Sequence, residues 1–123
     1  MNVLAAVIGV ALATLIHHAH NAEFLGEYPS MPAWLTPLGV YAAWLAATSI
    51  GFSGYALLRR GHRFAGFALL VAYASYGLDG LLHYTLAPAS AHTLAMNLTI
   101  GLEALAGAAL LFACLATRGR PSP

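Results

Sequence analysis

Six histidines are the residues of this 123-residue chain best suited to bind a transition metal, because neutral imidazole is the commonest side-chain ligand of such ions. Five of them lie where long apolar runs begin or end: His17, His18, His20, His83 and His92. Three imidazoles and one carboxylate would suit Zn²⁺, Cu²⁺ or non-haem iron. We therefore expect a metal site whose ligands are His17, His20, His83, His92 and Asp79.

Helical spacing selects these ligands. His17 and His20 are three residues apart and share a helix face, whereas His18 points elsewhere. Asp79 and His83 are four apart, so we expect them to stack, with Asp79 binding the metal or orienting a histidine through its ring N–H. The further polar or soft residues that we expect around the ligands, or in a relay, are His18, Asn21, Tyr76, Met96, Asn97 and Glu103.

Glu103 is the most deeply placed acidic residue. It follows His92 by eleven residues, which puts it about 16 Å further along a helix that rises 1.5 Å per residue. Two interpretations stay open. Glu103 is either a step in a proton or ion relay, or a protonated or hydrogen-bonded residue that holds its helix in register through Tyr73, Tyr76 or Thr48.

The order Asp79-x3-His83, followed by His92, resembles a copper-binding stretch in a membrane subunit of the particulate methane and ammonia monooxygenases. The likeness covers fewer than fifteen residues, and the second histidine comes earlier here than in that family. The resemblance implies copper as one candidate ion and does not extend to membership of the family.

The composition indicates what surrounds these residues. Hydrophobic residues make up 60% of the chain and charged residues only 7%, against about 25% charged in soluble domains. So few charges cannot cover a soluble surface, and we expect the lipid bilayer to solvate most of the chain. A basic surface for nucleic acid is lacking, so no nucleic acid is expected as a partner.

Four apolar runs, each near the roughly 20 residues that cross a bilayer, predict an all-α integral membrane four-helix bundle. We expect one transmembrane domain over 1–123, with a short polar tail at 118–123. The expected helices are at about 2–20, 35–59, 63–86 and 90–117. Small residues at near-helical steps predict close helix packing: Gly39, Ala43, Ala47 and Gly51 on the second helix, and Gly101, Ala104 and Ala108 on the fourth.

The arginines predict the orientation. Arg59, Arg60 and Arg63 lie between the second and third runs, and Arg118 and Arg120 follow the fourth. The positive-inside rule makes both places cytoplasmic, which gives an up-down-up-down bundle with cytoplasmic N- and C-termini in a bacterial inner membrane. The first run lacks the basic start and A-x-A site of a signal peptide, so we expect it to be retained. Aromatic residues expected at the outer interface are Phe24, Tyr28, Trp34 and Tyr84.

Three functions stay open. The first is a small inner-membrane protein that binds Cu, Zn or non-haem Fe, for metal handling or for redox chemistry at the membrane surface. The second is an electron-transfer subunit that uses haem b or quinone. Haem would take His17 or His20 together with His83. The third is a non-catalytic subunit or assembly factor, whose partners would be other membrane subunits or further copies of the chain. No residue set fixes a reaction type.

Overall fold

The chain is all-helical over the residues that its computed structural model describes, 2–118, as the sequence predicts. Four long helices make up most of it: α1 (Val3–Glu23), α2 (Pro37–Arg59), α3 (Arg63–Tyr76) and α5 (Leu94–Arg118). Short helical turns lie in the connections: η1 (Leu25–Glu27), η2 (Asp79–Leu82), α4 (His83–Leu86) and η3 (Ala89–Ala91). Arg120 and the rest of the expected tail after α5 lie outside the described residues.

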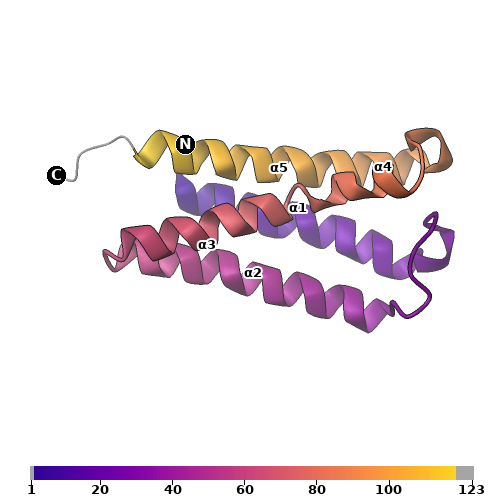
Figure 1. Ribbon diagram of the computed structural model, residues 1–123, viewed down its shortest axis with the longest axis horizontal. Helices are drawn as coiled ribbons and strands as arrows, with labels where there is room; N and C mark the ends of the chain where they lie inside the picture. The colour runs from indigo at the N-terminus through magenta and orange to yellow at the C-terminus, as the bar shows by residue number, and fades with distance from the viewer. Residues whose placement is uncertain (1, 119–123) are drawn as a thin grey trace.

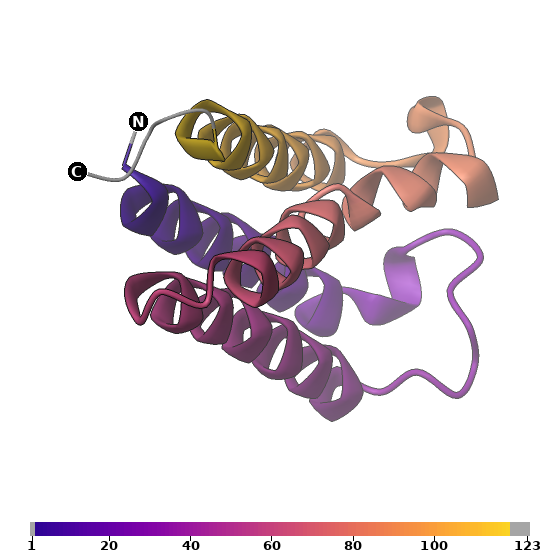
Figure 2. The same cartoon turned by 60° about the vertical axis from the view of Figure 1, so that its left-hand side comes forward.

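The long helices lie side by side around one apolar core (Figure 1). Both α1 and α3 pack against α2 and α5. The core includes Val7, Val10, Leu70 and Leu110, all of them fully buried. The α2–α3 connection lies at one end of the bundle and the two longer connections lie at the other (Figure 1). Figure 2 shows α3 running obliquely, beside α2 where it begins and toward α5 where it ends.

Capping residues fix helix ends that differ from the predicted ones. α5 begins at Leu94 rather than 90, because the Oγ1 atom of Thr93 accepts a hydrogen bond from the N–H of Met96 at 3.2 Å. Thr36 caps α2 in the same way, accepting from the N–H of Gly39 at 3.1 Å. His92 therefore lies just before α5 instead of on it, and α1 extends past residue 20 to Glu23.

The third apolar run is not the single helix that we predicted. α3 ends at Tyr76, and the run continues as the 3₁₀ segment η2 and then α4. Glycines at 77 and 80 weaken the helix here, and a 3₁₀ segment has three residues per turn instead of 3.6. Asp79 and His83 therefore do not stack on one continuous helix: Asp79 is exposed in η2, whereas His83 is buried at the start of α4.

Glycines form the closest contacts between helices. Between α2 and α3, a Cβ atom on Gly66 would lie 2.9 Å from the carbonyl oxygen of Gly54. Between α3 and α5, a Cβ atom on Gly107 would lie 2.7 Å from the carbonyl oxygen of Ala74. These four residues were not among those predicted to pack closely. Of the predicted glycines, Gly51 lies at such a contact, against the ring of Tyr73, whereas Gly101 would have nothing within 4 Å of its Cβ atom.

Three stretches are long and apolar enough to cross a membrane: Val3–Glu23, Arg63–Leu86 and Leu94–Thr117. α2 has the required length but is less apolar than these three. Large apolar side chains face outward on the bundle, among them Leu38 at 78% and Phe64 at 89% exposure. Soluble proteins rarely expose large contiguous apolar patches. These features are consistent with a membrane protein.

Candidate functional site

The predicted ligands come from the last turns of α1, from η2 and α4, and from the residue pair before α5. His17, His83 and His92 are buried, with exposures of 2%, 8% and 7%. Their rings form a row, in which the ring centroids are 5.3 Å apart between His17 and His83 and 6.0 Å apart between His83 and His92. Three of the four histidines predicted as ligands are thus neighbours in the structure.

Glu103 faces His17 inside the bundle, and its Oε2 atom lies 3.5 Å from His17 Nε2. The hydroxyl of Thr99 donates its one hydrogen to the carbonyl of Met96 at 3.0 Å, so it accepts from His17 Nδ1, which is 3.2 Å away. A neutral His17 therefore carries its hydrogen on Nδ1 and has its lone pair on Nε2, the atom that lies 3.5 Å from the carboxylate. Neither oxygen of Glu103 has a hydrogen-bond partner.

Asn21 connects His17 to His83. Its Nδ2 atom lies 3.3 Å from His17 Nε2 and 3.4 Å from His83 Nε2, and the amide has one hydrogen to donate to each. The Nε2 lone pairs of both rings therefore point toward the same amide group. The Oδ1 atom of Asn21 and the Nδ1 atom of His83 are buried without partners.

His92 has one ring nitrogen fixed and the other free. Its Nδ1 atom donates to the carbonyl of Pro88 at 3.0 Å, since a carbonyl can only accept. The Nε2 atom thus keeps its lone pair, and it is buried without a partner. Asn97 holds this segment by donating to the carbonyls of His92 at 3.3 Å and Ala89 at 3.1 Å, and it accepts from the Tyr84 hydroxyl at 2.8 Å.

His18 has both ring nitrogens engaged. Its Nδ1 atom donates to a backbone carbonyl one turn earlier at 2.8 Å, and its Nε2 atom accepts from the Tyr76 hydroxyl at 2.6 Å. Tyr73, in turn, lies 3.3 Å from Thr48 through the two hydroxyl oxygens. The hydrogen-bond partners that we expected for Glu103 are therefore bonded elsewhere, and the nearest nitrogen to its Oε2 atom is that of His17.

Three residues at the site were not predicted: Tyr28, Met31 and Thr99. Tyr28 is buried, with its ring centroid 5.1 Å from that of His83, and burial raises the pKa of its hydroxyl. The segment after α1 folds back over the bundle, which residue spacing cannot reveal. Thr99, by contrast, lies four residues before Glu103, so helical periodicity could have found it.

His20 lies beside this row and not within it. Its Nδ1 atom is 2.9 Å from the Tyr28 hydroxyl, and its ring also packs against that of Phe24, with the centroids 4.7 Å apart. His20 thus contacts the site through Tyr28, whose ring separates it from His83.

A cavity of about 150 Å³ lies among these side chains. Its lining consists of His17, His18, Asn21, Met31, Asp79, Gly80, His83 and Glu103. This lining contains two carboxylates and, within the part of the chain that the structure describes, no arginine. Imidazole and carboxylate groups around so small a space are suited to a small cation.

The ligand atoms are not all in place for a metal ion. Among residues 2–118, no three His, Cys, Asp or Glu side chains are grouped closely enough to hold one. Met96 is buried, and its sulfur accepts from the N–H of Thr93 at 3.4 Å. His17 and Glu103 form a pair at short range, and a third ligand requires a change of side-chain rotamer.

No known protein family, curated protein or solved structure matches the chain.

Proposed function

We propose that the chain binds a transition-metal ion within a membrane-spanning helical bundle. The proposed ligands are His17, His83 and Glu103 from the cavity lining, and His92, whose ring lies beside that of His83 outside the lining. Asp79 is a second carboxylate at the edge of the cavity. One observation carries the proposal: two buried lone-pair atoms, His17 Nε2 and Glu103 Oε2, face each other at 3.5 Å. Asn21 Nδ2 donates to His17 Nε2 at 3.3 Å, whereas Glu103 Oε2 has no partner. A proton or a metal ion between the two atoms would satisfy the carboxylate, and the Asn21 amide would turn aside to admit it.

A metal ion accounts for more of the site than a proton does. A proton shared by His17 and Glu103 would leave the Nε2 atom of His92 and the second oxygen of Glu103 buried and unpartnered, at about 1–3 kcal/mol for each such group. A metal ion accepts several lone pairs at once. The Nδ1–H groups of His17 and His92 donate to Thr99 and Pro88, as metal-bound imidazoles commonly do.

The size of the cavity and the types of ligand favour an ion over haem b. About 150 Å³ is well below the roughly 300–1,000 Å³ of sites that hold drug-sized ligands, and a porphyrin needs a site of that larger class. Imidazole and carboxylate ligands without a thiolate suit Cu²⁺, Zn²⁺ or non-haem iron. The ion would serve metal handling or redox chemistry at the membrane surface, and this ligand set assigns no further reaction type.

We place the site on the outer side of a bacterial inner membrane, with α2 as a fourth span. Arg59, Arg60 and Arg63 lie at the α2–α3 connection, which is at the opposite end of the bundle from the site (Figure 1). The positive-inside rule puts that end in the cytoplasm, and with it both chain termini of an up-down-up-down bundle. An ion would then reach the site from outside the cell.

Metal analysis tests the proposal directly. We expect the purified protein to carry about one metal ion per chain after dialysis against Zn²⁺, Cu²⁺ or Fe²⁺, measured by multi-element mass spectrometry with an absorption spectrum. His17→Ala and His83→Ala should lower the metal affinity at least about tenfold, because each removes a ligand. His62→Ala, at the exposed arginine end, is the matched control and should bind as the parent does. Failure of all three ions to bind, and to raise the unfolding temperature, would overturn the proposal.

Gly80 provides a second test, because it leaves room for the Glu103 carboxylate. A Cβ atom at position 80 would lie 2.5 Å from Glu103 Oε2, which is the movable end of a side chain. Gly80→Ala should therefore displace the carboxylate from His17, weaken metal binding and change stability by less than about 1 kcal/mol. Titration with the metal, alongside Gly101→Ala as a control with open space, checks this. Unchanged affinity in Gly80→Ala would contradict the role of Glu103 as a ligand.

A further inference from the structure

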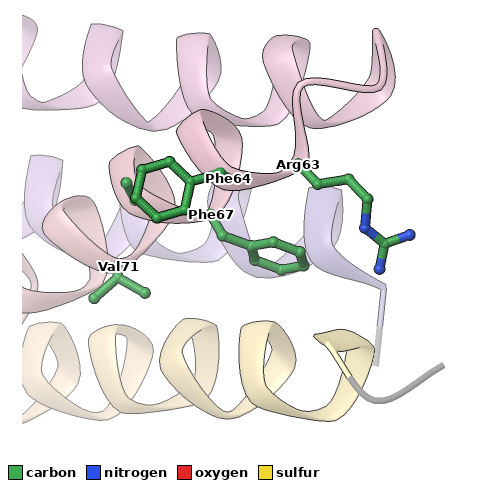
Figure 3. Close-up of a pocket in the computed structure, with 5 residues that line it drawn as sticks. Arg63, Phe64, Phe67 and Val71 are labelled. Atoms are coloured by element: carbon green, nitrogen blue, oxygen red, sulfur yellow. The ribbon is translucent and has the colours of Figure 1, made fainter.

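A groove of about 400 Å³ runs along α3 at the opposite end of the bundle from His17, His83 and His92. It is lined by Arg63, Phe64, Phe67, Ala68 and Val71. Figure 3 shows Phe67 and Val71 directed from α3 toward α5, with Arg63 at the end of the row. The groove thus has an apolar length and one cationic end.

The glycine contacts set the course of α3 beside this groove. Gly66 brings the start of α3 against Gly54 of α2, and Gly77, just after α3 ends, meets Gly107 of α5. A helix fixed at these two points runs obliquely across the bundle, as Figure 2 shows. Near residue 63, α3 lies beside α2, and the residues that line the groove there all belong to α3.

Among residues 2–117, the charged side chains at this end are all of one sign. Arg59, Arg60 and Arg63 are exposed around the α2–α3 connection. The four acidic residues of the chain lie elsewhere, at positions 23, 27, 79 and 103. An anionic group beside Arg63 would therefore meet only cationic neighbours from α2 and α3, and clustered arginines beside a span favour anionic lipid headgroups.

We propose that the groove binds one anionic glycerophospholipid, with its phosphate on Arg63 and one acyl chain along Phe64, Phe67 and Val71. The dimensions agree with this occupant. From residue 63 to residue 71 a helix rises about 12 Å, close to the ~15 Å that one leaflet contributes to the hydrocarbon core. If each methylene group takes about 30 Å³, the volume of one water molecule, the groove of about 400 Å³ holds roughly a dozen methylene groups.

Native mass spectrometry of the full chain in mild detergent tests this proposal. Phosphatidylglycerol and phosphatidylcholine of the same acyl chains are titrated separately. We expect a one-lipid complex with phosphatidylglycerol at a concentration at least about fivefold lower than with phosphatidylcholine, since one headgroup charge near the surface is worth about that factor. Arg63→Gln should abolish this difference. Arg60→Gln, which changes an arginine outside the groove lining, should keep most of it.

Ala68→Trp separates the groove from the charge alone. Ala68 is exposed, so a tryptophan there should fill the groove without disturbing the core. It should lower phosphatidylglycerol binding at least about fivefold while every arginine is kept. Equal binding of both lipids by the parent, or unchanged binding in Ala68→Trp, would overturn the proposal. A dimer of the parent protein that is lost in Ala68→Trp would also overturn it, because a second copy of the chain would then occupy the groove. None of these results depends on the metal site.

Discussion

Replacing Gly107 with alanine is expected to lower the free energy of unfolding by about 1–3 kcal/mol, because overpacking at a tight contact costs roughly this much. The added Cβ atom would lie 2.7 Å from the carbonyl oxygen of Ala74 and 2.8 Å from the carbonyl carbon of Gly77. Both are backbone atoms, so α3 and α5 have to move apart. This contact also sets the oblique path of α3, so the loss should affect the whole bundle.

Gly101→Ala is the matched control for Gly107→Ala, since it makes the same change in the same helix with nothing within 4 Å of the new methyl group. Alanine is favoured over glycine in a helix, so Gly101→Ala should be neutral or stabilising by up to about 1 kcal/mol. Unfolding by SDS in mixed micelles, followed by circular dichroism, measures both. Equal stability of the two variants would contradict the close approach of α3 and α5.

Glu103→Gln is expected to act in opposite directions on metal binding and on stability. The amide keeps the shape of the side chain but removes an anionic ligand, so metal affinity should fall at least about tenfold. In metal-free protein, the amide can donate to His17 Nε2 directly, whereas the carboxylate must first take up a proton to do so. The free energy of unfolding should then rise by about 1 kcal/mol.

Glu27→Gln serves as the control for this pair of effects, because Glu27 is exposed in η1 and lies outside the cavity. Both quantities are measured at pH 8, the stability in the presence of a chelator and the affinity by titration. A loss of about 1 kcal/mol or more in metal-free Glu103→Gln would identify the glutamate as a structural hydrogen-bond partner, and the metal proposal would lose its main support.

The long helices were predictable because an apolar run as long as the bilayer is thick has few other ways to satisfy its backbone hydrogen bonds. The end of α2 at Arg59 and the start of α3 at Arg63 agree with the expected positions, since charges and Gly61 mark that turn. The break after Tyr76 was not predictable from hydropathy, which continues across it. The contact of Gly77 with Gly107, distant in the sequence, accompanies that break.

The candidate site was predictable in its members more than in its bonding. Positions near the ends of apolar runs were enough to expect His17, His83 and His92 together. The positions of the Nε2 lone pairs of His17 and His92 were not predictable, because they depend on which group accepts a hydrogen bond from the Nδ1 atom of each ring. Thr99 and Pro88 take that role, one from a neighbouring helix and one from a connection. Residue types and spacing do not reveal the hydrogen bond of His17 with Thr99 or that of His92 with Pro88.

The clearance at Gly80 links two positions that are far apart in the chain. The Oε2 atom of Glu103 occupies the space that a side chain at position 80 would need. Substitutions at the two positions should therefore be correlated among homologous sequences, because residues in contact vary together. A chain with a larger residue at position 80 should carry a shorter or uncharged one at position 103, and such a protein should lack both this pocket and the proposed metal binding.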